Sequence, residues 1–596
     1  MHLSFNQNHT LIKPKSQSLY SASSMYKTVL LVLLFITRFQ PVSAQDFKEN
    51  HDHHFLVLFA DKGLRYVGMD SLPAHFTQAA LERRGKFGIS FDSLDLPVTK
   101  AYVSNISVEG VDVRYTTRWL NGAVITVSDP EVARRLKVKF FVRKVVYIGS
   151  TKQRTNKSES SELKSEKELK TYSPAGFSGI NYGVTEQQVK MLKVDRWHKF
   201  GQLGKGIKIA VFDAGFYKYD RLPALKHLVD ESRILGTYDL VRFDGSVAED
   251  DAHGMHVLGC IAGFEPGTYV GSAPAADFFL FRTEDSHSET LLEELNWIRA
   301  AEIADSLGVD IINSSLGYTT FDDMVMDHTH AELDGVTTYI ARGAEFASSR
   351  GILVVSSAGN DGNKFWRKLD TPADAESVLT IGAVNRNRTR ANFSSVGPTS
   401  DGRLKPDVSA LGHQTSILST YGGAYTGNGT SYSAPIMAGM VACMMERYPN
   451  MPLGELRDAI RFSAHQAMRP DTLIGYGIPD AHFIDLMFDT SDLSGISVII
   501  SGEPTAGIGS FPVDVMGSTK KEFYISTLER RVFLFIPYMK IVDAQRFKNK
   551  GLLHRTHWDL PKHKRSRLSI RIHENEKGAR KKKYLLREYS WTMKAQ

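Results

Sequence analysis

The sequence predicts an α/β fold in three layers, in which helices cover both faces of a mostly parallel central sheet. From Ile207 onward, short apolar runs alternate with helical stretches. The runs are nearly continuous in Ile, Val, Leu and Phe, which is typical of strands buried on both faces of a parallel sheet. They are IKIAVF, FFLF, DIINSS, ILVVSS and SVLTIGAV. At 596 residues the chain is too long for one compact core, so we expect further domains around this one.

Upstream of the sheet, residues 45–150 have the pattern of a small α+β unit. Three strand-like segments, FLVLFA, AVITV and KFFVRKVVYIG, accompany one helical stretch from Thr77 to Lys86. Residues 151–180 are rich in Lys, Glu, Ser and Thr and nearly free of large apolar residues. Such a segment cannot bury enough surface to offset its ordering entropy, so we expect a flexible linker that a protease would cut.

The first 44 residues contain a candidate signal peptide. Residues 25–44 begin with a short charged start, continue in an apolar run and end in small residues before Gln45. The run has about half of the roughly 20 apolar residues that a membrane helix needs. We therefore expect export, to the medium or the cell envelope, and no membrane span in the mature protein. Residues 1–24 are a possible upstream extension, with Met25 as the true start.

The positive charge of the chain is concentrated at its C-terminal end. The net charge is +7, and residues 545–596 carry 16 Lys and Arg against 4 Asp and Glu, which leaves 57 against 62 for the first 544 residues. A basic run is usually a solvated or disordered segment, so we expect a basic tail at 545–596 and no nucleic-acid partner. Before it, residues 491–544 contain SGISVIISG, EFYIST and RVFLFIPYMKI, which predict a small β-rich region.

The cysteine content limits the chemistry. There are two, Cys260 and Cys443, too few for a disulfide framework or a thiolate metal cluster. Each lies in an apolar helical stretch, so we expect buried free thiols. If those two helices pack together, a single disulfide bridge between the two cysteines is the alternative.

Three glycine-marked motifs place polar residues where a predicted strand ends or a helix starts. They are VFDAG with Asp213, DAHGMHV with His253 and GTSYSAP with Ser431. A buried carboxylate can fix the tautomer of a histidine, which can take a proton from a serine. The order Asp, His, Ser is one in which this triad occurs. An apolar helix is expected from Ile436 to Met445, with Pro435 in its first turn, where proline is tolerated.

With these motifs, residues 181–490 resemble the subtilisin-like serine peptidases (the subtilase family), in particular their secreted Bacteroidetes-type group. The resemblance implies a serine endopeptidase that hydrolyses peptide bonds of polypeptide substrates through an acyl-enzyme. It assigns Asp213 as the acid, His253 as the base and Ser431 as the nucleophile. The rivals His256 and Ser433 do not match the family positions.

The same resemblance implies an oxyanion donor and two walls of a substrate site. Asn360, in the motif SSAGNDG, would donate its side-chain amide to the oxyanion. The walls would flank the residue before the scissile bond, and they consist of Ser315, Leu316, Gly317, Ser357, Ala358 and Gly359. No carboxylate stands in these two segments, so we expect a broad preference without a strict requirement for Arg or Lys.

By the same resemblance, residues 45–150 would be a propeptide that assists folding and inhibits the peptidase until it is cut away, and the protein would be a zymogen. An ordinary accessory domain is the alternative. We expect a monomer without a cofactor, because the family's common calcium loop has little room after the His-bearing helix, although a structural calcium stays possible.

Two residues depart from the family pattern. Ala214 stands where Ser or Thr is usual, and Met255 replaces a Thr. These two departures motivate an alternative function. In that alternative, the protein has a subtilase fold with impaired catalysis and serves in binding or surface attachment.

Overall fold

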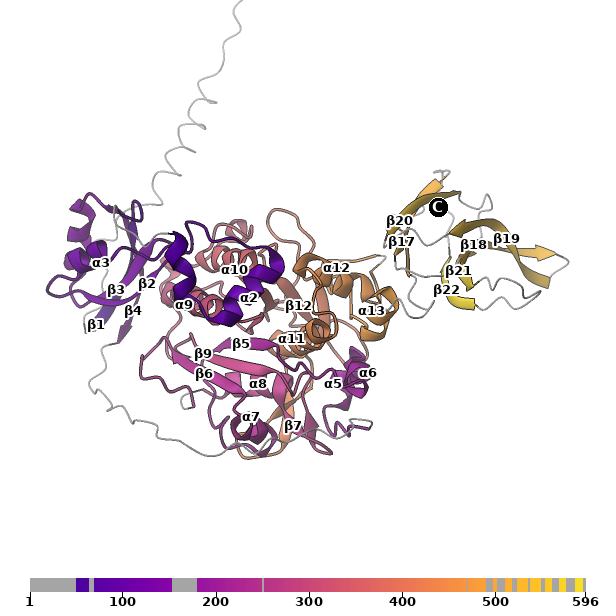
Figure 1. Ribbon diagram of the computed structural model, residues 1–596, viewed down its shortest axis with the longest axis horizontal. Coiled ribbons are helices and arrows are strands. Elements are labelled where there is room, and N and C mark those ends of the chain that lie inside the picture. The colour runs from indigo at the N-terminus through magenta and orange to yellow at the C-terminus, as the bar shows by residue number, and fades with distance from the viewer. Residues whose placement is uncertain are drawn as a thin grey trace, which may run out of the picture. The chain divides into compact units, whose positions relative to one another are not determined.

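The computed structural model describes residues 50–63, 69–152, 179–248, 251–467 and 469–488, together with the backbone of seven strands between 497 and 592 (Figure 1). The predicted upstream extension and signal peptide, and nearly all of the predicted linker, lie outside these residues. Among the helices described, none combines the length and the apolar character that crossing a bilayer requires.

The central sheet has seven strands, in the order β13-β12-β11-β10-β5-β9-β6, and every neighbouring pair is parallel. The α/β fold with a parallel sheet is thus confirmed, and all five predicted runs are strands. The strands are β5 (Lys208–Asp213), β6 (Ile234–Asp239), β9 (Asp277–Arg282), β10 (Ile311–Ser314), β11 (Leu353–Ser357), β12 (Leu379–Val384) and β13 (Val408–Leu411).

Helices cover both faces of this sheet, and β5 shows why. Ile209 and Val211 pack in one apolar cluster with α8 (His253–Ala262) and α11 (Thr430–Arg447). Ala210 and Phe212 pack in another with α9 (Leu291–Leu307) and α10 (Tyr339–Ser349). Successive side chains of a strand point to opposite faces, so a continuous apolar run can bury both.

Shorter elements complete this domain. The remaining helices are α5 (Glu186–Met191), α6 (Val194–Lys199), α7 (Lys226–Asp230), α12 (Leu453–Ser463) and α13 (Ala481–Phe488). Two small antiparallel pairs join β7 (Phe264–Glu265) to β8 (Tyr269–Val270) and β14 (Thr415–Leu418) to β15 (Ala424–Gly427). Cys260 in α8 and Cys443 in α11 are buried free thiols, as predicted.

The N-terminal unit is a four-stranded antiparallel sheet with the order β2-β3-β1-β4. Thr77 caps its main helix by accepting a hydrogen bond from the Ala80 N–H, which explains why the helix starts where the sequence predicts. The elements are β1 (His51–Phe59), α2 (Gln78–Phe87), α3 (Lys100–Ile106), β2 (Asp112–Thr117), β3 (Gly122–Val127), α4 (Pro130–Arg135) and β4 (Val142–Lys152).

One apolar cluster joins this sheet to the helices α9 and α10. Leu56 of β1, Val124 of β3 and Ile148 of β4 are fully buried in the same cluster as Leu295 of α9 and Ala344 of α10. The hydrophobic effect therefore holds the N-terminal unit on the face of the parallel sheet opposite to α8 and α11.

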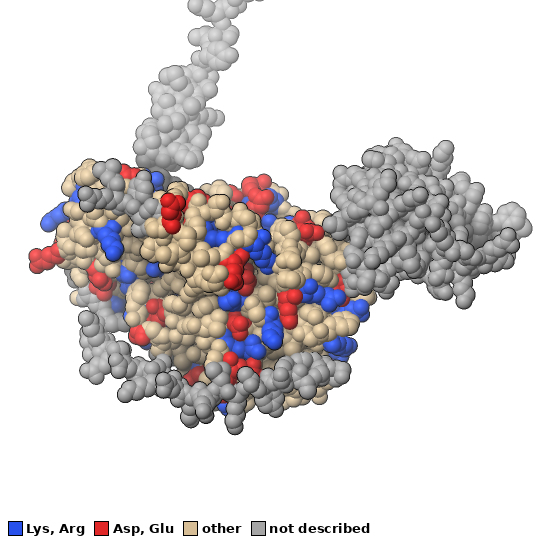
Figure 2. Space-filling view, in the orientation of Figure 1, with Lys and Arg blue, Asp and Glu red and all other residues tan. Residues whose placement is uncertain are grey.

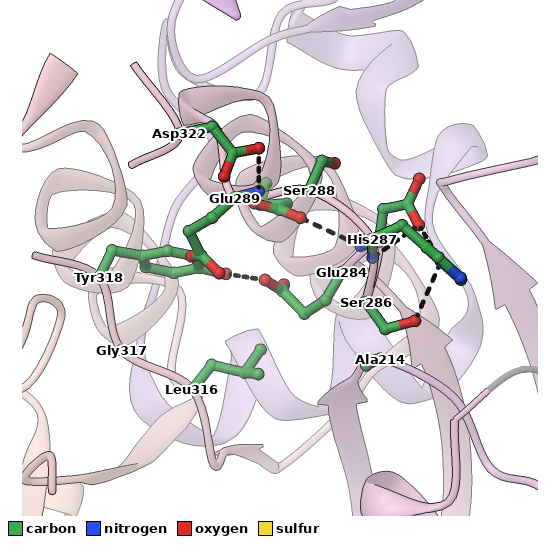
Figure 3. Close-up of a pocket in the computed structure, with 12 residues that line it drawn as sticks. Ala214, Glu284, Ser286, His287, Ser288, Glu289, Leu316, Gly317, Tyr318 and Asp322 are labelled. Atoms are coloured by element: carbon green, nitrogen blue, oxygen red, sulfur yellow. Dashed lines mark hydrogen bonds and ion pairs between the residues drawn. The ribbon is translucent and has the colours of Figure 1, made fainter. Parts of the chain in front are cut away.

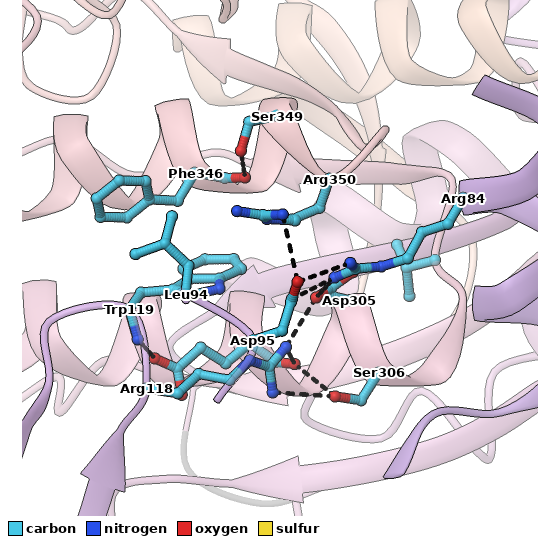
Figure 4. Close-up of polar contacts among 12 residues, drawn as sticks. Arg84, Leu94, Asp95, Arg118, Trp119, Asp305, Ser306, Phe346, Ser349 and Arg350 are labelled. Atoms are coloured by element: carbon cyan, nitrogen blue, oxygen red, sulfur yellow. Dashed lines mark hydrogen bonds and ion pairs between the residues drawn. The ribbon is translucent and has the colours of Figure 1, made fainter. Parts of the chain in front are cut away.

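A buried ion-pair network lies at the same contact (Figure 4). Arg84 of α2 bridges Asp95 at 2.7 Å and Asp305 of α9 at 2.8 Å. Arg118 also reaches Asp305, at 2.7 Å, and Arg350 at the end of α10 pairs with Asp95 at 3.4 Å. The Asp305 side chain is fully buried, so its charge depends on cations supplied by the N-terminal unit.

The C-terminal strands form two antiparallel sheets, β16-β17-β20 and β19-β18-β21-β22. A β-rich region was predicted at 491–544, and three of these strands fall within the predicted basic tail at 545–596. The strands are β16 (Ser497–Ile500), β17 (Ser510–Met516), β18 (Phe523–Phe533), β19 (Ile536–Phe547), β20 (Leu553–Asp559), β21 (Arg567–Glu574) and β22 (Leu585–Thr592).

Replacing Asp305 with Asn in the full chain should destabilise the folded state, because Arg83, Arg84 and Arg118 would lose the carboxylate they share. Removing one partner from a buried pair costs about 3–5 kcal/mol. Urea titration should show a loss of that order in the free energy of unfolding. The matched control is Asp458→Asn, on an exposed carboxylate of α12, which should cost about 0.5 kcal/mol or less. Equal losses in the two variants would contradict the role of this network.

Candidate active site

Asp213 and His253 form the centre of the site. Asp213 is the last residue of β5, and its side chain is fully buried. His253 is the first residue of α8, and its Nδ1 lies 2.8 Å from Asp213 Oδ1 and 3.0 Å from Oδ2. A carboxylate only accepts hydrogen bonds, so Nδ1 carries the proton and Nε2 is left as the basic nitrogen.

The surroundings of His253 favour its protonated form. Burial of the ring opposes the charge, but the charge and hydrogen bond of Asp213, with the nearby charge of Asp251, raise the pKa of His253 above its ordinary value. Asp251 also accepts the backbone N–H of His253 at 2.6 Å. The site therefore stabilises the imidazolium that forms when a histidine takes a proton.

Ser431 is the second residue of α11, which begins at Thr430. We expected this helix to start at Ile436, and that start is wrong. The helix begins six residues earlier, so Pro435 is its sixth residue. Proline lacks the N–H that would bond the Ser431 carbonyl one turn earlier. The hydroxyl of Ser315 donates to that carbonyl instead, at 2.9 Å, so the helix continues and Ser431 keeps its place in the first turn.

The Ser431 hydroxyl donates to the carbonyl of Ser315 at 3.2 Å. The next residue, Tyr432, has its ring centroid 5.9 Å from that of His253, which places the start of α11 beside the base. Rotation about the Cα–Cβ bond would turn the hydroxyl from Ser315 toward another acceptor. Catalytic hydrogen bonds often form fully only when substrate is bound.

Asn360 is fixed by its contact with Thr430. Its Oδ1 accepts the backbone N–H of Thr430 at 2.9 Å and the Thr430 hydroxyl at 3.1 Å. Because a backbone N–H can only donate, the amide must present its oxygen to Thr430 and turn Nδ2 away. The structure thus brings a side-chain N–H donor to the start of α11, one residue from Ser431.

The two rival residues make other contacts. The Nε2 of His256 lies 3.2 Å from the Tyr425 hydroxyl, and burial, with the charge of His253, lowers the pKa of His256 to about 4. The hydroxyl of Ser433 is fully buried and donates to the Ala410 carbonyl at 3.2 Å. Neither rival contacts the Asp213 carboxylate.

The two departures from the family pattern leave the central contact in place. The backbone N–H of Ala214 donates to Asp213 Oδ1 at 2.9 Å, a bond that needs no side chain at position 214. Met255 is fully buried in the apolar cluster beneath α8.

The two predicted substrate walls lie side by side. The first wall follows β10, and the second wall begins at Ser357, the last residue of β11. Ser314 pairs with Ser356 in the parallel register of these strands.

Sequence reasoning missed a neighbour of both walls, Asp370. No motif marks this residue, and its contact with the walls depends on the tertiary fold.

A pocket of about 460 Å³ opens beside the site (Figure 3). The Tyr318 hydroxyl donates to Glu284 there at 2.5 Å. Burial raises the pKa of Glu284 to about 7, although hydrogen bonds from Thr283 and Tyr318 oppose the shift. Most of the lining is acidic or polar, and it consists of Ala214, Glu284, Asp285, Ser286, His287, Ser288, Glu289, Glu293, Leu316, Gly317, Tyr318 and Asp322.

Within the described residues, no three His, Cys, Asp or Glu side chains are grouped as a metal site would require. The expectation that the protein works without a cofactor stays a prediction.

Replacing Asp251 with Asn should shift the pH dependence of peptide hydrolysis and leave the Asp213–His253 pair intact. Asn can still accept the His253 N–H, but the charge that helps to raise the His253 pKa is lost. A general base must be neutral to act, so the acidic limb of kcat/KM should move to lower pH. Asp244→Asn, in an exposed turn, makes the same chemical change and should leave the limb in place. An unmoved limb in the Asp251 variant, or one moved to higher pH, would argue against this electrostatic role.

Comparison with known proteins matches two parts of the chain to described families. Residues 204–477 match the model of the subtilase family, and residues 54–165 match that of the peptidase S8 propeptide domain of Bacteroidota. The minor extracellular protease Epr of Bacillus subtilis is 32% identical over 277 residues, which cover 45% of this chain and 37% of the relative. Subtilisin DY of Bacillus licheniformis is 27% identical over 289 residues, or 48% of this chain and 91% of the relative.

Among solved structures, MycP1 with its N-terminal propeptide removed matches with a TM-score of 0.39 and 24% identity, over 49% of this chain and 95% of that one. The chain spans only 37% of the length of Epr but 91% of that of subtilisin DY. The chain therefore carries a subtilase domain at residues 204–477 and a Bacteroidota peptidase S8 propeptide domain at residues 54–165.

Proposed function

We propose that the protein is a secreted serine endopeptidase made as a zymogen, with Asp213, His253 and Ser431 as its catalytic triad. One observation carries the proposal. The Nδ1 of His253 lies 2.8 Å from the buried Asp213 carboxylate, and the start of α11 brings Ser431 to the same edge of the sheet. An Asp–His pair beside a serine at a helix start is the arrangement that acyl transfer requires.

In the proposed reaction, His253 Nε2 takes the hydroxyl proton of Ser431, and Oγ forms a bond to the peptide carbonyl carbon. The carbonyl oxygen becomes an oxyanion that accepts hydrogen bonds from Asn360 Nδ2 and the Ser431 N–H. The C–N bond then breaks, and His253 passes its proton to the leaving amine. Water, deprotonated by His253, attacks the ester, and the proton returns to Ser431 as the acid product leaves.

The position of the N-terminal unit supports an inhibitory propeptide. A Cβ placed on Gly149, near the end of β4, would lie 2.6 Å from the Thr290 Cβ. Thr290 directly follows the acidic segment 284–289 that lines the pocket. The chain thus leaves the propeptide sheet beside the candidate substrate site, and a cut within 151–180 would separate the two domains.

Export is supported by the signal-like pattern of residues 25–44 and by the similarity to Epr of Bacillus subtilis, a protease named as extracellular. We propose polypeptides as the substrates. The catalytically impaired alternative predicts the opposite outcome in the following experiment.

Replacing Ser431 with Ala should abolish labelling by a fluorophosphonate probe and self-cleavage within 151–180, because the nucleophile is lost. Hydrolysis of casein should fall by roughly 10⁶-fold, the size of the loss in subtilisin, a relative. The matched control is Ser433→Ala, two residues away, which should still be labelled because its hydroxyl bonds a backbone carbonyl. Undiminished labelling of the Ser431 variant would place the nucleophile elsewhere, and an unlabelled unmodified chain would favour the impaired alternative.

Replacing Asn360 with Ala should lower kcat about 100- to 1000-fold with a smaller change in KM, because the amide would contact the oxyanion and not the ground state. Stopped assays on one peptide substrate would measure both constants. A variant that loses affinity while kcat is kept would exclude Asn360 as an oxyanion donor.

A further inference from the structure

A short segment at Asp370 is tied to both walls of the predicted substrate site. The Asp370 N–H donates to the carbonyl of Ala358, in the second wall, at 3.3 Å. Thr371 and Tyr318, the residue after the first wall, exchange two backbone hydrogen bonds of 3.0 and 3.3 Å. These bonds fix the backbone of Asp370 where the two walls come together.

The Asp370 side chain lies against a glycine in each wall. A Cβ placed on Gly359 would lie 2.2 Å from Asp370 Oδ2, and one placed on Gly317 would lie 2.7 Å from the Asp370 Cβ. A larger residue at either position would therefore collide with Asp370. Because both glycines lack side chains, the Asp370 side chain lies directly against the backbone of the two walls.

The Asp370 carboxylate lacks the partner that its burial calls for. Its Oδ1 is buried and has no hydrogen-bond partner among the described residues. Lys364, a cation whose charge acts on it, pairs with Asp361 at 2.7 Å and is largely exposed. Burial raises the pKa of Asp370 well above its usual range, and the charge of Asp361 adds to this while Lys364 opposes it. A buried carboxylate in this state gains most from a cation that arrives from outside.

We propose that Asp370 is a specificity-determining residue, and that the side chain bound between Gly317 and Gly359 is the cation of an Arg or Lys just before the scissile bond. The proposal rests on the proposed function and replaces the expectation of a broad preference. Arg fits best, because a guanidinium can donate two parallel hydrogen bonds to one carboxylate.

The neighbouring pocket has acidic side chains in its lining. It shares Gly317 with the first wall, and its lining includes Glu284, Asp285, Glu289 and Asp322 (Figure 3). Burial raises the pKa of Glu284 to about 7 and that of Glu289 to about 8, so a basic substrate side chain would favour the charged form of both carboxyl groups.

The test uses the full chain after self-processing and peptide substrates that differ only in the residue before the scissile bond. That residue is Arg, Lys, Phe or citrulline, the last being a neutral mimic of Arg. We expect kcat/KM for Arg to exceed that for citrulline by roughly 100-fold or more, the scale set by a buried charge left without its partner. Equal rates for Arg and citrulline, or a preference for Phe, would overturn the proposal.

The variant Asp370→Asn should lose that factor for Arg and Lys and keep or improve its rate for Phe. Asp361→Asn is the matched control, since it removes a neighbouring carboxylate that pairs with Lys364, and it should keep the Arg preference. An equal loss on every substrate, or an unchanged Arg preference in Asp370→Asn, would overturn the assignment.

Labelling by the fluorophosphonate probe separates the two hypotheses. A chain that is labelled and cleaves peptides without preference for a basic residue contradicts the role of Asp370 alone. A chain that is neither labelled nor active contradicts the proposed function on which that role rests. The label also reports whether the Asp370→Asn variant is folded. If the variant is not folded, the substrate series on the unmodified chain alone tests the preference for a basic residue.

Discussion

A carboxylate removed from water must be given a partner, and three aspartates of this chain are governed by that constraint. Asp213 is buried at the end of a strand and bonds the ring of His253. Asp305 is buried under the N-terminal sheet and pairs with arginines of the propeptide domain. Asp370 has a buried oxygen without a hydrogen-bond partner among the described residues. Each carboxylate is thereby linked to a different part of the proposed function.

The three solutions differ in when the partner is present. The partner of Asp213 is part of the same subtilase domain, so this contact needs neither the propeptide domain nor a substrate. The partners of Asp305 belong to the propeptide domain, so their contribution holds that domain on α9 and α10 only while it is attached. In our proposal, the partner of Asp370 arrives with the substrate. Burial disfavours the charged form of Asp370 in the empty site, and a bound cation would favour that form, which selects cationic side chains over neutral ones.

Local features of the sequence were enough to predict the centre of the fold. Continuous apolar runs predicted five of the seven parallel strands. Glycine-marked motifs located Asp213 at the end of one run and His253 at the start of a helix, and the structure brings these two residues into contact. The other two strands of this sheet, β6 and β13, have no such run, because β6 reads ILGTYD and β13 has four residues. The Asp305 network and the place of Asp370 were beyond prediction because they depend on segments far apart in the chain. Pro435 lies inside α11 because Ser315, from another strand end, bonds the carbonyl that proline leaves unpaired.

The central claim is that the Asp213 carboxylate supports a charged His253. A site-resolved NMR titration of the His253 ring, in the full chain with Ser431→Ala to prevent self-cleavage, tests it most directly. The account predicts a pKa above the ordinary value of 6.5, because the charge and hydrogen bond of Asp213 outweigh the burial of the ring. A value at or below 6.5, in the direction that burial imposes on His256, would show that the pair is not coupled in this way and would contradict the account.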